Sequence, residues 1–173
     1  NSVIALKFFL TISLLFLTLT SCVGGNGNAY LGFSKSGFIK SYDSVKIRLR
    51  HLDIVNALRQ ENGLKNLSYS RELNASADTH AVDIANQKRA WNFGSDYSSP
   101  QDRAEASNYS GIVRGDNGSE TFEGEFEVLQ VWVKNNLASK IVLDDEANQL
   151  GLGWYQDGNG TIWWVQVLGQ STN

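Results

Sequence analysis

Histidine and cysteine, two side chains often used in nucleophilic and metal chemistry, are rare in this sequence. The 173 residues include two histidines, His51 and His80, and a single cysteine, Cys22. One cysteine cannot form an intramolecular disulfide, and neither histidine has a second histidine or a cysteine at the spacing of a metal site. No G-x-S-x-G string, phosphate loop or complete dinucleotide fingerprint occurs. What the two histidines can do therefore depends on the elements that hold them.

His51 lies in a segment, residues 43–62, whose apolar residues recur at near-helical intervals. Gly63 follows the segment and suits the left-handed conformation that ends many helices. We predict a helix over this range. Because charged residues flank His51, we expect its side chain to be solvated.

His80 lies in a second predicted helix, which Ser70 can cap and in which Glu72 occupies the first turn. It shares one face of this helix with apolar residues, so we expect a buried, hydrogen-bonded histidine. A catalytic base at this position would need a nucleophile and an orienting carboxylate that the sequence does not place beside it. The apolar residues of that face are Leu73, Ala77, Ala81 and Ile84.

The run 91–111 is the least generic part of the chain. Residues 94–96, Gly-Ser-Asp, predict a tight loop. Ser99 is the predicted cap of a third helix, because Pro100 suits a first helical position and Asp102 favours the positive end of the helix.

The rest of the chain predicts a strand, a helix and a hairpin. We expect a short strand over 111–118, a fourth helix over about 120–136, and a terminal hairpin of strands 150–155 and 162–168 around a Gly-rich turn. The outer face of the fourth helix is acidic. A solvated face explains it, with a weak calcium site or a basic partner as alternatives. Its glutamates are Glu120, Glu123, Glu125 and Glu127.

The N-terminal part has the features of an export signal. An apolar run over 8–19 is shorter than the roughly 18 residues that a membrane-spanning helix needs. The string L-T-S-C that ends at Cys22 resembles a bacterial lipobox, in which the cysteine is lipidated after cleavage. We therefore expect a lipoprotein signal peptide over 1–21, a lipidated Cys22 and tether over 22–42, and one globular domain over 43–173. An ordinary cysteine near a membrane anchor is the alternative.

The charge pattern excludes one class of partner. The formal net charge is −3, and the 15 basic residues form no stripe or cluster. Nucleic-acid binding requires such a basic surface, so we expect no nucleic-acid partner.

Several strings resemble the bacterial branch of the CAP superfamily (cysteine-rich secretory protein, antigen 5 and pathogenesis-related 1), whose domain is also called SCP. They are G-S-D-x-S-S-P-x-D-R-A-x-x-x-x-Y-x-G from Gly94, I-V-N-x-L-R-x-x-N-G-L-x-x-L and L-x-x-x-A-x-x-H-A-x-D-I-A in the first two helices, and T-I-W-W-V-Q-V-L-G near the end. The resemblance runs in order from about Val45 to Gly169. It implies an α/β fold, a three-layer α-β-α sandwich with a small, mainly antiparallel sheet, and the mixed order of helices and hairpin fits that class.

The resemblance also implies a cavity. CAP domains commonly line it with two histidines and two acidic residues that can hold a divalent metal such as zinc. Here the resemblance places Asn92 and Ala138 at the histidine positions, Asp116 at one acidic position and Asn135 at the other. Asparagine is a poor zinc ligand, alanine is none, and aspartate reaches one methylene less far than glutamate. We therefore expect a degenerate cavity with no metal, no cofactor and no metal-assisted hydrolysis.

The expected function is binding. We expect a non-enzymatic monomer, held at the outer membrane or cell surface through Cys22, that binds a protein, a sterol or another lipid. The alternative is a metal-dependent or unconventional hydrolase that uses Asp116 and His80, and it predicts a close, solvent-open contact between these two side chains. A structural envelope protein without a ligand pocket is a third possibility, and it predicts a cavity filled by side chains.

Overall fold

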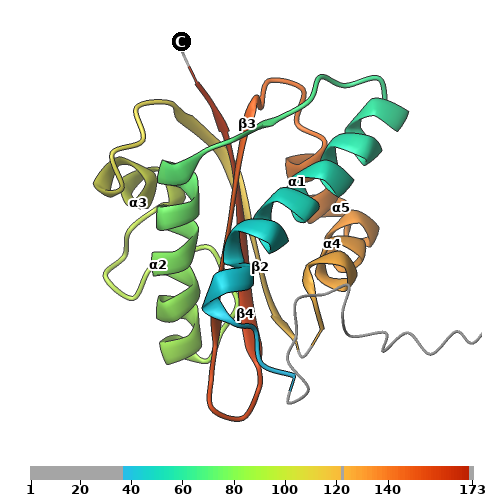
Figure 1. Ribbon diagram of the computed structural model, residues 1–173. Helices are drawn as coiled ribbons and strands as arrows, with labels where there is room; N and C mark the ends of the chain where they lie inside the picture. Colours follow the sequence, from blue (N-terminus) through green and yellow to red (C-terminus); the bar gives the residue numbers. More distant parts are fainter. Residues whose placement is uncertain (1–36, 122, 172–173) are drawn as a thin grey trace, which may run out of the picture.

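The computed structural model describes residues 37–121 and 123–171, which form three layers. A four-stranded sheet lies between two groups of helices (Figure 1). The α-β-α sandwich expected from the sequence is confirmed. Helices α2 (Arg71–Gln87) and α3 (Pro100–Ala106) cover one face, and α1 (Ser44–Glu61), α4 (Glu125–Lys134) and α5 (Asn136–Val142) cover the other.

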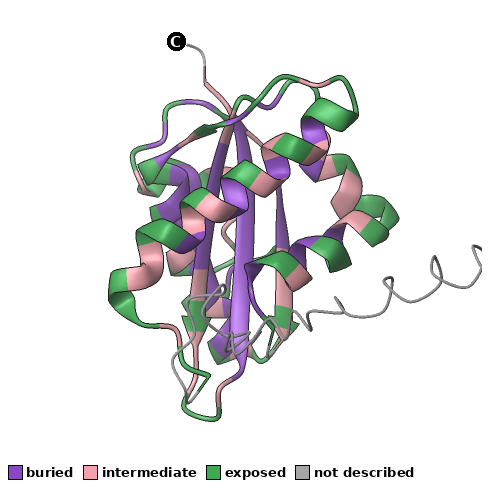
Figure 2. Cartoon of the chain, turned by 45° about the vertical axis from the view of Figure 1, so that its right-hand side comes forward, coloured by how far each residue is buried: buried purple, intermediate pink, exposed green. Residues whose placement is uncertain are grey.

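The sheet has the order β1-β3-β4-β2 and is mainly antiparallel, because only β1 runs parallel to its neighbour β3. Side chains of the central strand β4 alternate between the two helical layers: Trp164 joins the core under α1 and α4, and Trp163 joins the core under α2. Strand β4 is accordingly buried along almost its whole length, whereas the outer helix faces are exposed (Figure 2). The strands are β1 (Ser68–Tyr69), β2 (Ile112–Thr121), β3 (Gln149–Gln156) and β4 (Ile162–Gln170).

The β3–β4 pair is the hairpin predicted from the sequence. Two glycines of β3 explain how closely α2 packs on it. A Cβ atom at Gly151 would lie 2.3 Å from the backbone carbon of Leu73, and one at Gly153 would lie 2.2 Å from the backbone nitrogen of Asp78. Real Cβ atoms do not approach backbone this closely, so glycine is required at both positions for α2 to lie against the strand.

The first three predicted helices and their caps are confirmed. Ser70 Oγ accepts a hydrogen bond from the Leu73 N–H at 3.1 Å and caps α2. Ser99 and Asp102 form a capping box on α3, with Pro100 as the first helical residue. These local signals are strong because each satisfies an N–H that the helix itself leaves unpaired.

The predicted boundary between strand and fourth helix is wrong. Strand β2 continues past Gly118 to Thr121, and α4 begins only at Glu125. Glu120 and Thr121 are paired with residues of β4, so the ladder of the sheet extends the strand. Gly124 then provides the N-cap of α4.

Two predictions of solvent exposure are also wrong. The His51 side chain is 0% exposed, and its Nε2 atom lies 2.8 Å from Gln166 Nε2. Trp132 of α4 packs edge-on against its ring, so α4 removes from solvent the face of α1 that holds His51. Glu125 is buried as well, because Arg50 of α1 donates to its Oε1 at 2.7 Å.

Most of the predictions for the N-terminal part concern residues that the structure does not describe. Cys22 and the predicted signal peptide over 1–21 lie outside the described residues. Of the predicted tether, residues 37–42 lead into a short 3-10 helix, η1 (Ser41–Asp43), and the Ile39 N–H donates to Gln156 Oε1 on β3 at 2.8 Å. Within 37–121 and 123–171, no helix has the length and apolar character needed to cross a membrane.

Candidate functional site

The four positions that the resemblance selects lie around one cavity beside the edge strand β2. Asn92 follows α2, Asp116 belongs to β2, and Asn135 and Ala138 lie at the junction of α4 and α5, yet all four line the same space of about 260 Å³. Asn117 and Ser119 add further polar groups to the lining. The fold thus brings together segments that are distant in sequence and leaves space between them, which a structural protein with a filled cavity would not have.

Asp116 is held from two sides. Arg103 Nη2 of α3 lies 3.0 Å from its Oδ2 atom, and both side chains are buried. Asn92 Nδ2 donates to the Asp116 carboxylate and, at 2.9 Å, to its backbone carbonyl. Burial raises the pKa of Asp116, and the hydrogen bonds from Asn92 and Arg103 act in the opposite direction. The carboxylate is therefore part of a buried, internally satisfied ion pair.

His80 is buried and hydrogen-bonded, as predicted. Its side chain is 1% exposed, and Nε2 lies 2.8 Å from the Trp91 carbonyl oxygen. A carbonyl only accepts, so Nε2 carries the proton and Nδ1 presents a lone pair. Burial and the nearby Arg103 lower the pKa of His80, which is consistent with this neutral form. Asp116 Oδ2 is 4.0 Å from Nε2, and neither group is open to solvent.

The residues of this cavity do not fit zinc. The amide nitrogen of Asn92 is spent on Asp116, and a metal at that carboxylate would have to displace the Arg103 guanidinium. Within the described part of the chain, no three His, Cys, Asp or Glu side chains are grouped so that they could hold a metal ion. A zinc site needs such a group of neutral imidazole, thiolate or carboxylate donors.

A buried polar chain leads from the cavity to His51, and sequence reasoning missed it. Asn117 Nδ2 lies 3.2 Å from both the Ala138 carbonyl oxygen and Gln166 Oε1, and Gln166 in turn contacts His51. The Gln166 side chain points into the core from β4, where the neighbouring core-facing residues of the strand are apolar. That interruption of the apolar pattern is the sequence signal that could have revealed a buried polar partner.

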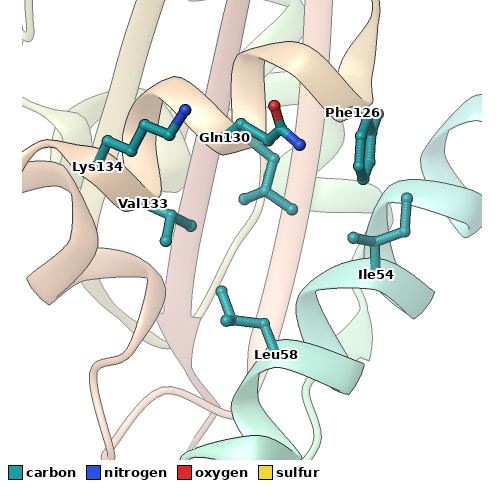
Figure 3. Close-up of a pocket in the computed structure, with 7 residues that line it drawn as sticks. Ile54, Leu58, Phe126, Gln130, Val133 and Lys134 are labelled. Carbon is teal, nitrogen blue, oxygen red and sulfur yellow. The ribbon is translucent and has the colours of Figure 1, made fainter.

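A second hollow of different character lies between α1 and α4. It is an apolar groove of about 240 Å³, and its two walls are formed by side chains of α1 and α4. Figure 3 shows Ile54 and Leu58 of α1 directed toward Phe126 and Val133 of α4. Leu129 completes the apolar lining, and Gln130 and Lys134 stand at its margin. We call this hollow the α1–α4 groove.

Known proteins share sequence with this chain. The model of the family "Cysteine-rich secretory protein family" (CAP) matches residues 52–168. The chain is 26% identical over 119 residues to "Uncharacterized protein YkwD" of Bacillus subtilis. The match covers 69% of this chain and 46% of YkwD, so the chain spans about half the length of that relative.

Solved structures show the same fold. An extracellular protein containing a SCP domain from Bacillus anthracis superposes with a TM-score of 0.66 at 17% identity, over 73% of this chain and 41% of that chain. An outer surface protein from Borrelia burgdorferi superposes with a TM-score of 0.64 at 12% identity, over 78% of this chain and 97% of that chain. At these identities the likeness concerns the fold.

Proposed function

The chain belongs to the cysteine-rich secretory protein (CAP) family, and from that premise we propose that it is a non-enzymatic, surface-exposed bacterial protein that binds a single-chain lipid in the α1–α4 groove. The observation that carries the proposal is the groove itself. Five of its seven lining residues are apolar, whereas the lining of the cavity around Asp116 includes an aspartate, three asparagines and a serine.

The groove suits an acyl chain better than a bulky ligand. Its volume of about 240 Å³ lies below the roughly 300–1,000 Å³ typical of sites for whole small molecules. Each methylene buried from water contributes about 0.8 kcal/mol, so the affinity for an acyl chain grows with the number of methylenes that the groove covers. Lys134 at the margin supplies a cation for a carboxylate or phosphate headgroup. A fatty acid or a similar anionic amphiphile therefore matches both the walls and the margin.

The arrangement around Asp116 supports a binding role over hydrolysis. A general base must reach the proton that it removes, but His80 Nε2 is committed to the Trp91 carbonyl and the Asp116 carboxylate is committed to Arg103. The solvent-open contact that a hydrolase based on these two residues needs is replaced by a buried one. The His80 nitrogen nearest to Asp116 is thus already occupied, so the two side chains cannot act together as the sequence-based alternative requires.

For location, we propose lipid anchoring through Cys22 at the outer membrane or cell surface. The L-T-S-C string supports it, as do the extracellular and outer-surface relatives. Expression of the full chain with an azide-labelled fatty acid tests the anchor: label should enter the wild type and be absent from Cys22→Ser. Equal labelling of both would refute lipidation at this residue without touching the groove.

The groove is tested by displacement of a fluorescent fatty acid from the purified protein. Leu58→Trp and Val133→Trp place an indole inside the groove and should each weaken binding at least tenfold. Val82→Trp is the matched control, since Val82 is 43% exposed on α2, on the other side of the sheet. Unchanged affinity in both groove variants, or an equal loss in the control, would exclude this site. Displacement by a sterol but not by fatty acids would redirect the proposal to another ligand.

A further inference from the structure

A third hollow lies between α2, the loop at 94–98 and α3, and nothing in the binding role proposed above uses it. Its volume is about 540 Å³. Three carboxylates line it, those of Asp83, Asp96 and Asp102, together with Arg103 and His80. The Arg103 charge is already balanced by Asp116, which lines the neighbouring cavity, so the three aspartates leave this hollow with an excess of negative charge. We call it the acidic cavity.

The three carboxylates are held in place by neighbouring donors. Asp83 Oδ2 accepts from the Ser95 N–H at 2.9 Å and from Gln87 Nε2 at 2.8 Å. The Ser98 N–H donates to Asp96 Oδ1 at 2.9 Å, and the Ser99 N–H donates to Asp102 Oδ2 at 2.8 Å. The orientation of the three charges is therefore fixed before any ligand arrives.

These carboxylates are ionised at neutral pH. Burial alone would raise the pKa of Asp83, but hydrogen bonds from Ser95 and Gln87 lower it overall. Bonds from Ser98 lower the pKa of Asp96, and bonds from Ser99 lower that of Asp102. A hydrogen bond to the charged form of an acid always shifts the equilibrium this way.

An unpartnered buried atom adds an independent observation. His80 Nδ1 has no hydrogen-bond partner among residues 37–121 and 123–171. It lies 3.9 Å from Asp83 Oδ2, and both residues line the acidic cavity. Because Nε2–H is given to the Trp91 carbonyl, Nδ1 is an acceptor. Two acceptors thus face each other, and the described part of the chain places no donor between them. A buried acceptor without a donor is costly, so the arrangement calls for an incoming N–H group.

We propose that the acidic cavity binds an organic cation through N–H donors, a primary ammonium or a guanidinium, with Asp83 and His80 Nδ1 as its hydrogen-bond acceptors and Asp96 and Asp102 as additional charges. The shared chemistry is that of a free amine, such as a short polyamine, and of a lysine or arginine side chain on a peptide. A quaternary ammonium has the same charge but no N–H, so it satisfies the charge and donates to neither Asp83 nor His80 Nδ1.

The chain itself provides a site-specific readout, because it contains only two histidines. In an NMR titration of the full-length protein at neutral pH and low salt, the ring C–H signal of His80 reports on the acidic cavity, and that of His51, buried under α4, reports on the fold. Butylammonium should shift the His80 signal with saturation in the millimolar range or tighter and leave His51 unmoved. Trimethylbutylammonium should bind at least fivefold more weakly.

Variants that remove one charge while keeping the acceptor oxygen test the lining. Asp83→Asn and Asp96→Asn should each weaken butylammonium at least fivefold. Asp53→Asn on the exposed side of α1 is the matched control and should have no effect. Putrescine and a glycine-rich peptide with one lysine distinguish a free amine from a side chain as the physiological source, and saturable binding of either supports the site.

Several results would overturn the proposal. They are no shift of His80 with any amine, equal affinity for the quaternary cation, or binding that survives both Asp83→Asn and Asp96→Asn. Tighter binding of calcium than of any amine would assign the cavity to a metal instead. The groove between α1 and α4 is independent of all these outcomes, because no residue is shared between the two linings.

Discussion

Replacement of His51 by glutamine should reduce the amount by which the free energy of unfolding falls when the pH is lowered. His51 is fully buried in the folded state, and burial lowers its pKa from 6.5 to about 4. The unfolded chain has an ordinary histidine that takes up a proton below pH 6.5. Between pH 6.5 and about 4 the unfolded state therefore binds more protons, so the free energy of unfolding falls as the pH falls through this window.

The magnitude follows from the same two values. Each tenfold difference in proton affinity corresponds to 1.36 kcal/mol, so the difference between 6.5 and about 4 gives a loss of roughly 3 kcal/mol by pH 4. That is a large share of the roughly 5–15 kcal/mol by which domains are stable. His51→Gln should have lower stability at pH 7 because packing against Trp132 changes, yet lack this part of the acid loss.

Urea unfolding of both proteins at a series of pH values from 7 to 4 measures the effect. The carboxylates contribute to both curves and cancel in the difference, and His80→Gln serves as the control that retains the contribution of His51. The reasoning is refuted if the stability difference between wild type and His51→Gln stays constant over the series. It is equally refuted if NMR finds His51 titrating near 6.5 in the folded protein.

Three further experiments have defined outcomes. Gly153→Ala should lower the free energy of unfolding by about 3 kcal/mol in thermal or urea denaturation, because the new Cβ meets the backbone of α2. Gly158→Ala should be nearly neutral, because no atom of the described residues lies within 4 Å of the added Cβ. Arg59→Met should cost about 4 kcal/mol or prevent folding, as judged by circular dichroism, because this buried guanidinium donates to four backbone carbonyls that would lose their partners. Calorimetric titration with zinc should show no micromolar binding, which would correspond to roughly −8 kcal/mol. Such binding in the wild type that vanishes in Asp116→Ala would contradict the fit of the cavity described above.

Sequence reasoning succeeded for several structures that are encoded locally. The cap of α2 at Ser70 and the box on α3 at Ser99 are made by residues within three positions of one another. The β3–β4 hairpin has its alternation and its turn in one continuous run. The burial of His80 likewise follows from the helical period alone. The same continuous strings carry the resemblance to the CAP family, so family and fold were predictable.

The remaining features depend on partners far along the chain, and no local pattern contains them. Strand β2 extends through Thr121 because β4 offers it a ladder, and His51 is buried because Trp132 reaches it from α4. Charged neighbours in sequence predict exposure, but packing of a second helix overrides them. Side chains from at least two elements line each of the three hollows, which are the cavity beside β2, the α1–α4 groove and the acidic cavity. Local strings therefore predict the helices, the strands and the family. Which side chains line the same cavity, and which charges already form ion pairs, depends on distances that only the folded chain sets.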